Sequence, residues 1–179
     1  MNEEDFDSFK ESKILKNINE KIMISNLIKR NKKIKFTLLY QVSRDGDRIS
    51  TFFNKVKDKF PTLIIIKSKS GFKFGGYTSI PWDQTGKYKS DELAFIFSLD
   101  KKKKYTIKNN ETKYAIYGYS YRFAFGSGFD FSVYDHCTKK NDNYCNTPYS
   151  YNTNQKSELT GGQYNYVVDD LEVYHVEFE

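Results

Sequence analysis

Short apolar runs separated by turn residues fill the sequence from Phe36 onward, and this spacing limits the fold more than any other feature. Runs rich in β-branched and aromatic residues and bounded by Gly, Pro, Asn or Asp are typical of strands. Many short strands with few helices predict a mainly β fold of the α+β kind, a two-sheet antiparallel β-sandwich with a few short flanking helices. The predicted strands cover residues 36–42, 62–67, 72–78, 94–99, 112–117, 121–125, 129–134 and 166–178, the last of them interrupted near Asp169 and Asp170.

Apolar residues recur at helical spacing in two stretches of the chain. In residues 12–30 they alternate with Lys and Glu, which predicts one or two short amphipathic helices. Residues 47–57 predict one further short helix. We therefore divide the chain into an N-terminal helical segment, residues 1–35, and a sandwich domain, residues 36–179, on which that segment packs or into which it leads.

The charge balance alone would suggest a polyanionic partner, but the kind of basic residue argues against one. The net charge is +6 and the pI is about 9.0. Only four of the 29 basic residues are arginines, whereas Arg is the residue expected at base edges and in bidentate phosphate contacts. The abundant Lys, Asn, Ile, Phe and Tyr all have AT-rich codons, so codon usage accounts for part of this balance. A nucleic-acid partner is therefore not favoured.

The sequence also bears on compartment. The longest aliphatic run covers only residues 63–66, far short of the roughly 18 residues of a membrane span. Residues 1–5 are acidic and lack the apolar region of a secretory signal. Two cysteines, Cys137 and Cys145, do not make a disulfide framework. These features predict a cytoplasmic protein without membrane insertion.

Two polar stretches are candidates for contacts. Residues 138–163 are rich in Asn, Thr, Ser, Lys and Tyr; we interpret them as a polar excursion, and a dedicated binding loop is the alternative. Residues 101–104 are four consecutive lysines, interpreted as a solvated hairpin tip that an acidic partner could contact.

Nucleophilic and metal-binding constellations are weak. His136 adjoins Cys137, but adjacent residues of a strand point to opposite faces and cannot form a dyad. With His175 and Cys145 these residues also lack zinc-site spacing. We predict no metal and no cofactor. Lys139 and Lys140 lie near Cys137, so peroxide chemistry at Cys137 or Cys145 stays open as an alternative.

Carboxylates gather near the end of the chain. Asp170 and Glu172 have the same parity and share a face of a regular strand, with Asp169 between the strand start and Asp170. A pair of this kind could serve glycoside hydrolysis, but no second motif supports it. Exposure to solvent or capping of backbone groups is the favoured interpretation.

Aromatic residues leave a third class of function open. Fifteen tyrosines could supply a platform for sugars or bases. Tyr117, Tyr119 and Tyr121 share strand parity, although Gly118 between them indicates a bend. A carbohydrate- or nucleic-acid-binding sandwich is therefore our third hypothesis.

Several motifs occur together in one order along the chain. They are Leu38-Leu39-Tyr40, Ser43-Arg44-Asp45-Gly46, Pro61-Thr62-Leu63, Phe74-Gly75-Gly76-Tyr77, Ile80-Pro81-Trp82, Phe125-Gly126-Ser127-Gly128-Phe129 and Val168-Asp169-Asp170-Leu171-Glu172-Val173-Tyr174. In this order they resemble the TLDc domain family, and the residues around Trp82 are most similar to members from single-celled eukaryotes. The structural or partner-contact candidates are Arg44, Asp45, Gly46, Gly75, Gly76, Tyr77, Trp82, Gly126, Gly128, Asp169, Asp170 and Glu172.

The resemblance implies a single sandwich unit that works as a non-enzymatic interaction domain. It further implies a link to oxidative-stress resistance and to regulation of the vacuolar proton ATPase through protein contacts, at endolysosomal membranes only by way of a partner. Arg44 and Asp45 are expected in a structured turn that joins a polar network with the C-terminal acids. Contact surfaces are expected on the N-terminal helix and in residues 101–104 and 138–163. A peroxide-reactive thiol enzyme or a carboxylate enzyme is the alternative.

Overall fold

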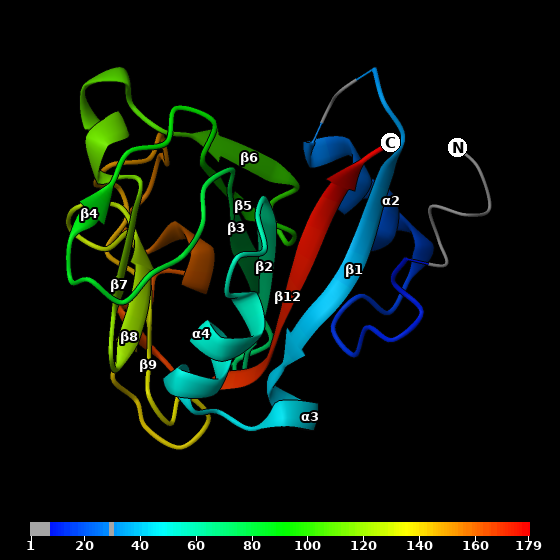
Figure 1. Ribbon diagram of the computed structural model, residues 1–179. Coiled ribbons are helices and arrows are strands. Elements are labelled where there is room, and N and C mark those ends of the chain that lie inside the picture. The colour runs from blue at the N-terminus through cyan, green and yellow to red at the C-terminus, as the bar shows by residue number, and fades with distance from the viewer. Residues whose placement is uncertain (1–7, 29–30) are drawn as a thin grey trace.

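Two six-stranded antiparallel sheets pack face to face in a computed structural model that describes residues 8–28 and 31–179 (Figure 1). This arrangement confirms the predicted β-sandwich. The first sheet has the order β1 (Ile34–Gln41), β12 (Val168–Phe178), β2 (Thr62–Ser68), β3 (Lys73–Thr78), β5 (Phe95–Ser98) and β6 (Lys103–Thr106). The second sheet has the order β11 (Asn165–Tyr166), β10 (Asn143–Tyr144), β9 (Phe131–Tyr134), β8 (Arg122–Phe125), β7 (Ile116–Tyr119) and β4 (Tyr88–Lys89).

The first sheet is buried on both faces. Ile64 and Ile66 of β2 face the core between the sheets, while Leu63 and Ile65 belong to a second apolar cluster on the outer face. The chain before β1 covers that outer face, through Phe9, Ile14, Leu15 and helix α2 (Ile18–Leu27). Burial on both faces explains why β2 is a continuous aliphatic run rather than an alternating one.

The helix over residues 47–57 is present as α4 (Ile49–Val56). Its buried residues Ile49, Phe52, Phe53 and Val56 follow helical spacing. The Phe52 ring stacks on Phe123 of the second sheet at 4.3 Å between centroids, so α4 closes one end of the sandwich.

The helical prediction for residues 12–30 is right only for α2. Asn17 caps α2 by accepting the Glu20 backbone N–H, and the Glu20 side chain returns a bond to the Asn17 backbone. Residues 12–15 are not helical, because the backbone N–H groups of Lys13 and Leu15 bond the side chains of Glu172 and Ser12 instead of a helical turn. The predicted end at Lys29 and Arg30, and the acidic residues 1–5, lie outside the described residues.

Two strand and loop predictions need correction. Residues 109–114 form a 3₁₀ helix, η1 (Asn109–Tyr114), so the strand expected over 112–117 begins only at Ile116. Residues 138–163 are not a solvated excursion. Asn143 is fully buried and donates from Nδ2 to the carbonyls of Cys137 and Tyr166, at 3.1 and 3.0 Å. Polar side chains turn inward there because they satisfy backbone groups that no strand pairs.

Candidate functional site

The carboxylate of Glu172 is the most densely bonded acidic group of the C-terminal motif. It lies on β12, facing the chain before β1, and its residue is fully buried. Its donors come from three separate parts of the chain: Ser12 Oγ (2.7 Å), Lys13 N (2.6 Å), Ile14 N (3.3 Å), Gln41 Nε2 (3.1 Å) and Tyr174 Oη (2.9 Å). With its lone pairs occupied, Glu172 ties the N-terminal segment to the sheet and leaves no free oxygen for a substrate proton.

Asp170 shares a face with Glu172, as its parity predicted. The register pairs Asp170 with Lys67 and Glu172 with Ile65 of the neighbouring strand β2. The Asp170 carboxylate accepts the backbone N–H of Ser43 at 3.0 Å and that of Leu171 at 2.9 Å. It therefore caps backbone groups, the favoured interpretation. Its neighbour Asp169 lies on the surface and pairs with Lys67 Nζ at 3.4 Å.

Arg44 and Asp45 lie in the one-turn helix α3 (Val42–Asp45), which ends at Gly46 with a φ of 87°. The Arg44 guanidinium donates to both Asp45 oxygens, at 3.0 and 2.8 Å, and holds the pKa of Asp45 below its ordinary value. Neither residue bonds a C-terminal acid directly. Gln41 makes the link, because its backbone N–H donates to Asp45 at 3.0 Å and its side chain donates to Glu172. Through Gln41, α3 and β12 form one network.

The remaining motif residues serve packing. A Cβ on Gly75 would lie 1.8 Å from the Ile64 carbonyl oxygen, so β3 approaches β2 too closely there for a side chain. A Cβ on Gly76 would lie 2.6 Å from the Phe125 ring, so the two sheets also meet closely at this point. Three further motif residues are buried, Tyr77 against Phe95, Trp82 with Nε1 donating to Thr62, and Gly126 against Asp130. Gly128 lies beneath the Tyr149 ring.

The two thiols are buried and unbonded to each other. Burial, followed by the nearby Asp47 carboxylate, raises the pKa of Cys137 to about 12. Burial also raises the pKa of Cys145. A reactive thiol needs the opposite shift, so the structure offers this alternative no support.

His136 and Cys137 lie in a turn after β9, not on the strand assumed from the sequence. His136 has a φ of 61° and its ring lies 3.5 Å from Asp47 and 3.6 Å from Asp135. His175 lies on β12, where its Nε2 is 3.2 Å from the Phe60 carbonyl oxygen. No three His, Cys, Asp or Glu side chains come together as a metal site within residues 8–28 and 31–179.

Asp130 is a buried acid that sequence reasoning missed. Its carboxylate accepts the backbone N–H groups of Tyr149, Ser150 and Tyr151, at 3.0, 2.9 and 3.2 Å. Burial raises its pKa to about 6 although these donors oppose the rise. The sequence did contain a sign of this burial, because Asp130 lies between Phe129 and Phe131, and large aromatic neighbours indicate a buried stretch of chain.

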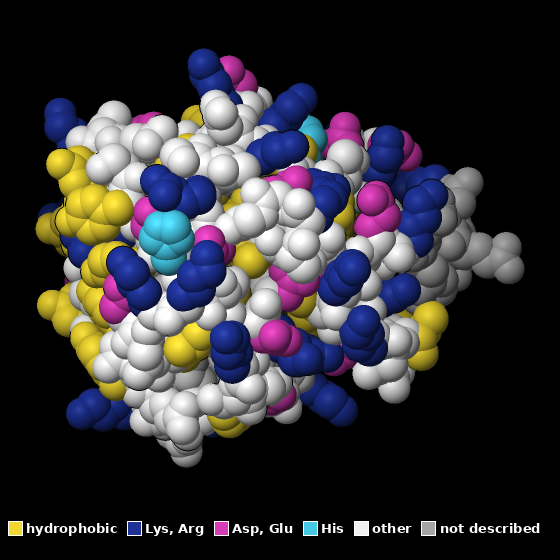
Figure 2. Space-filling view, turned by 90° about the horizontal axis from the view of Figure 1, so that it is seen from below, with side chains coloured by type: hydrophobic (Ala, Val, Ile, Leu, Met, Phe, Trp, Pro, Cys, Tyr) yellow, Lys and Arg dark blue, Asp and Glu magenta, His cyan; other side chains and the backbone are white. Residues whose placement is uncertain are grey.

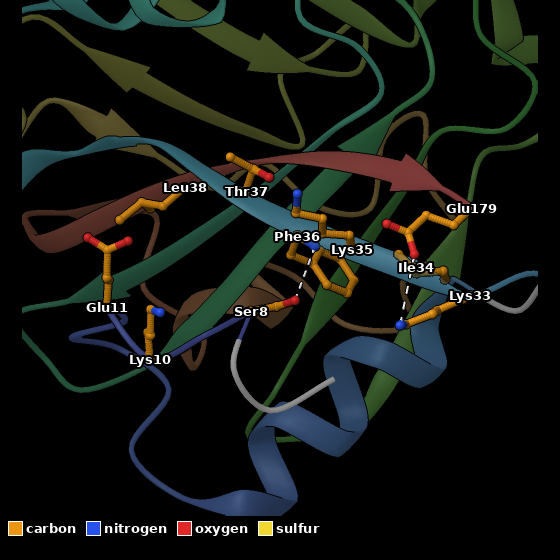
Figure 3. Close-up of a pocket in the computed structure, with 10 residues that line it drawn as sticks. All are labelled: Ser8, Lys10, Glu11, Lys33, Ile34, Lys35, Phe36, Thr37, Leu38 and Glu179. Atoms are coloured by element: carbon orange, nitrogen blue, oxygen red, sulfur yellow. Dashed lines mark hydrogen bonds and ion pairs between the residues drawn. The ribbon is translucent and has the colours of Figure 1, made fainter. Parts of the chain in front are cut away.

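Two hollows lie beside residues 8–16 of the N-terminal segment. One, of about 440 Å³, follows the free edge of β1, where the Phe36 N–H donates to Ser8 Oγ at 3.4 Å and Lys33 pairs with Glu179 (Figure 3). The other, of about 680 Å³, separates residues 10–16 from α3 and contains Gln41, Ser43 and Arg44. Both hollows lie next to the network around Glu172. The Glu172 carboxylate itself is buried and hydrogen-bonded, so it lines neither hollow as a free acid.

A family model described as the TLDc domain matches residues 8–177. The chain belongs to the TLDc domain family. The match includes the N-terminal segment held by Glu172, so the family's pattern extends across the expected boundary at residue 35. In this TLDc domain, no described helix is long and apolar enough to cross a bilayer.

Relatives of this TLDc domain share part of its sequence. They include the mTOR-associated protein MEAK7 of Xenopus laevis, 32% identical over 65 residues, which are 36% of this chain and 14% of the relative. MEAK7 of Mus musculus is 25% identical over 87 residues, 47% of this chain and 19% of the relative. The aligned region thus covers less than a fifth of either relative.

Proposed function

We propose that this TLDc domain is a non-enzymatic protein-interaction module. The supporting observation is the continuity of the three segments expected to make contacts. Lys104 Nζ donates to the Leu27 carbonyl of α2 at 2.7 Å, and Lys101 Nζ lies 3.4 Å from the Glu158 carboxylate in the segment 138–163. The lysine tip is thus tied to both neighbours rather than solvated throughout. Together they form one surface beside the first sheet.

This surface, which we call the α2 surface, is hollowed between α2 and the turn before β6. The hollow has a volume of about 1020 Å³ and presents Ile22, Met23 and Leu99 between Lys102 and Lys104. An apolar floor with a polar rim is the usual anatomy of a protein interface. Because Asp170, Glu172 and both thiols are buried inside the fold, a role in contact accounts for more of the structure than a role in catalysis.

The family and its relatives support a choice of partner class. We propose that the domain contacts subunits of the vacuolar proton ATPase and so contributes to oxidative-stress resistance, as the family resemblance implies. A complex containing mTOR is a second candidate partner, since the relatives carry the name mTOR-associated protein. In either case the chain is cytoplasmic and reaches endolysosomal membranes through its partner.

Affinity capture of the tagged chain from an extract that preserves intact pumps tests this function. We expect enrichment of ATPase or mTOR-complex subunits, measured by mass spectrometry against an untagged control. Met23→Glu with Lys102→Glu should abolish enrichment, and Lys57→Glu, an exposed change after α4, should not. Equal enrichment by both variants would reject the α2 surface, and no enriched protein would reject the interaction role.

A further inference from the structure

The outer face of the second sheet carries a row of aromatic rings. Successive centroids lie 5.2 Å apart from Tyr88 to Tyr117, 5.1 Å from Tyr117 to Phe129, 6.2 Å from Phe129 to Tyr144 and 5.1 Å from Tyr144 to Tyr164. The row crosses the sheet because the register places Tyr88 opposite Tyr117, and Ser132 opposite Tyr144. Phe129 bridges the gap between Tyr117 and Tyr144.

A second row lies beside the first, and its centre is a cation. The register places Arg122 opposite both Tyr119 and Tyr134. The Arg122 guanidinium lies 4.6 Å from the Phe129 centroid and 5.5 Å from those of Tyr121 and Tyr134. We call this surface the tyrosine face; it consists of Tyr88, Tyr117, Tyr119, Tyr121, Arg122, Phe129, Tyr134, Tyr144 and Tyr164.

The tyrosine face is open to solvent. Tyr121 is 44% exposed and Tyr164 is 46% exposed. Helices α2, α3 and α4 all lie on the other side of β7, β8 and β9 (Figure 1). Figure 2 shows hydrophobic side chains, a class that includes Tyr, gathered along the left edge of the molecule, the side on which β7, β8 and β9 lie in Figure 1. So many rings at the surface mark a site of contact, since single exposed apolar residues are normal but a contiguous patch is not.

Arg122 differs from the other arginines that the structure describes. Arg44 pairs with Asp45 at 2.8 Å and Arg48 with Asp135 at 3.6 Å, whereas Arg122 forms no ion pair with any described carboxylate. Its Nη1 donates to Tyr134 Oη at 2.7 Å, and its buried Nε has no hydrogen-bond partner. A half-buried guanidinium normally has a carboxylate or phosphate partner.

The surrounding chemistry favours a protein carboxylate over a nucleic-acid phosphate. A strand of nucleic acid needs several cations that follow its backbone between stacked bases. Apart from Arg122, the cation found over a ring of this sheet region is Lys113, at Tyr114. Tyr and Arg are the residue types enriched at the energetic centres of protein interfaces, where Lys is depleted.

We propose that the tyrosine face is a second docking surface, which binds an acidic protein segment through a carboxylate at Arg122 and apolar side chains against Tyr121 and Tyr164. It goes beyond the proposed function, because α2 and the tyrosine face lie on opposite sides of the sandwich. A domain with two such faces joins two partners, and loss of one contact leaves the other intact.

Selection of random dodecapeptides on the whole chain tests this proposal. Selected peptides should share an Asp or Glu beside apolar residues, and their affinity is measured by fluorescence anisotropy. Arg122→Gln should weaken binding by about 30-fold or more, as expected for an interface hot spot. Tyr121→Ser and Tyr164→Ser, at exposed positions that leave the fold intact, should each weaken it by about 5-fold.

Lys57→Gln is the matched control, since it removes an exposed cation after α4, away from the tyrosine face, and should change the affinity by less than about 2-fold. Failure to select peptides, selection of peptides without an acid, or binding unaffected by Tyr121→Ser and Tyr164→Ser would overturn the proposal, even if Arg122→Gln does not fold. Binding of a 12-nucleotide oligouridine that these changes abolish would reassign the face to single-stranded RNA. The affinity capture described above tests the α2 surface separately. The peptide experiment can therefore fail while the proposed function stands, and the reverse also holds.

Discussion

The hydroxyl of Ser12 donates to the carboxylate of Glu172 across 2.7 Å, although 160 positions separate the two residues in the sequence. The same carboxylate also accepts the backbone N–H groups of Lys13 and Ile14. One side chain of β12 thus holds a non-helical stretch of the N-terminal segment in place. The tie has measurable consequences for stability.

Glu172→Gln should destabilise the fold by about 3 kcal/mol, because an amide –NH₂ would then face donors and leave buried groups unpaired. The free energy of unfolding from urea titration measures the loss. Glu177→Gln is the control, since Glu177 lies at the exposed end of the same strand and bonds Thr37. A loss no larger than that of the control would show that Glu172 is not the tie described here.

Ile14→Ala should cost about 3 kcal/mol, since Ile14 is completely buried in the outer apolar cluster. Ile18→Ala provides a matched comparison, because Ile18 is 51% exposed and should change stability by less than about 0.5 kcal/mol. Thermal unfolding followed by circular dichroism separates the two. Equal effects would mean that the N-terminal segment does not pack on the first sheet.

Asp130 should make the domain more stable in mild acid. Its pKa is about 6 in the folded state, against an ordinary value of 3.8. Between these two pH values the folded state binds more protons than the unfolded state, so stability falls as pH rises from about 4 to about 6. The shift corresponds to a loss of about 3 kcal/mol by pH 7.

Urea titrations of the wild type and Asp130→Asn between pH 4.5 and pH 7 isolate this contribution. The variant has no proton to lose, so its stability should lack this decrease. Parallel curves for the two proteins would place the pKa of Asp130 near its ordinary value, at odds with its burial.

Cys137 and Cys145 should resist thiol reagents in the native protein. Both are buried, and the pKa of Cys137 is about 12, so almost no thiolate is present at pH 8. We expect labelling by 5,5′-dithiobis(2-nitrobenzoate) only after denaturation in guanidinium. Rapid labelling of the native chain would instead revive the peroxide-reactive alternative, and Cys137→Ser and Cys145→Ser would then identify the reactive thiol.

The sandwich could be predicted because its burial pattern is visible in apolar spacing. Residues 62–67 and 47–57 were placed well, since Ile64 and Phe52 belong to runs whose period matches a buried strand or helix. Residues 138–163 could not be placed this way. Asn143 and Ser150 are buried for their hydrogen bonds, which hydropathy does not register.

The sequence predicted the separate elements of the candidate site but not the hydrogen bonds that join them. The turn at Arg44 and the shared face of Asp170 and Glu172 followed from local pattern. The bonds that join them run through Gln41 and the backbone of Ser43, partners that any polar residue type could supply. The tyrosine face was predicted only in part. Tyr117, Tyr119 and Tyr121 were named from strand parity, whereas Tyr117 and Tyr144 become neighbours only through the ring of Phe129.

The position of β12 between β1 and β2 bears on how the chain is made. A ribosome delivers β1 and β2 long before the strand that separates them, so these strands cannot complete their sheet as they emerge. Until β12 arrives, both present unpaired edges of the kind that invites aggregation. The domain should therefore depend on chaperones during synthesis, and a chain truncated before Val168 should be insoluble.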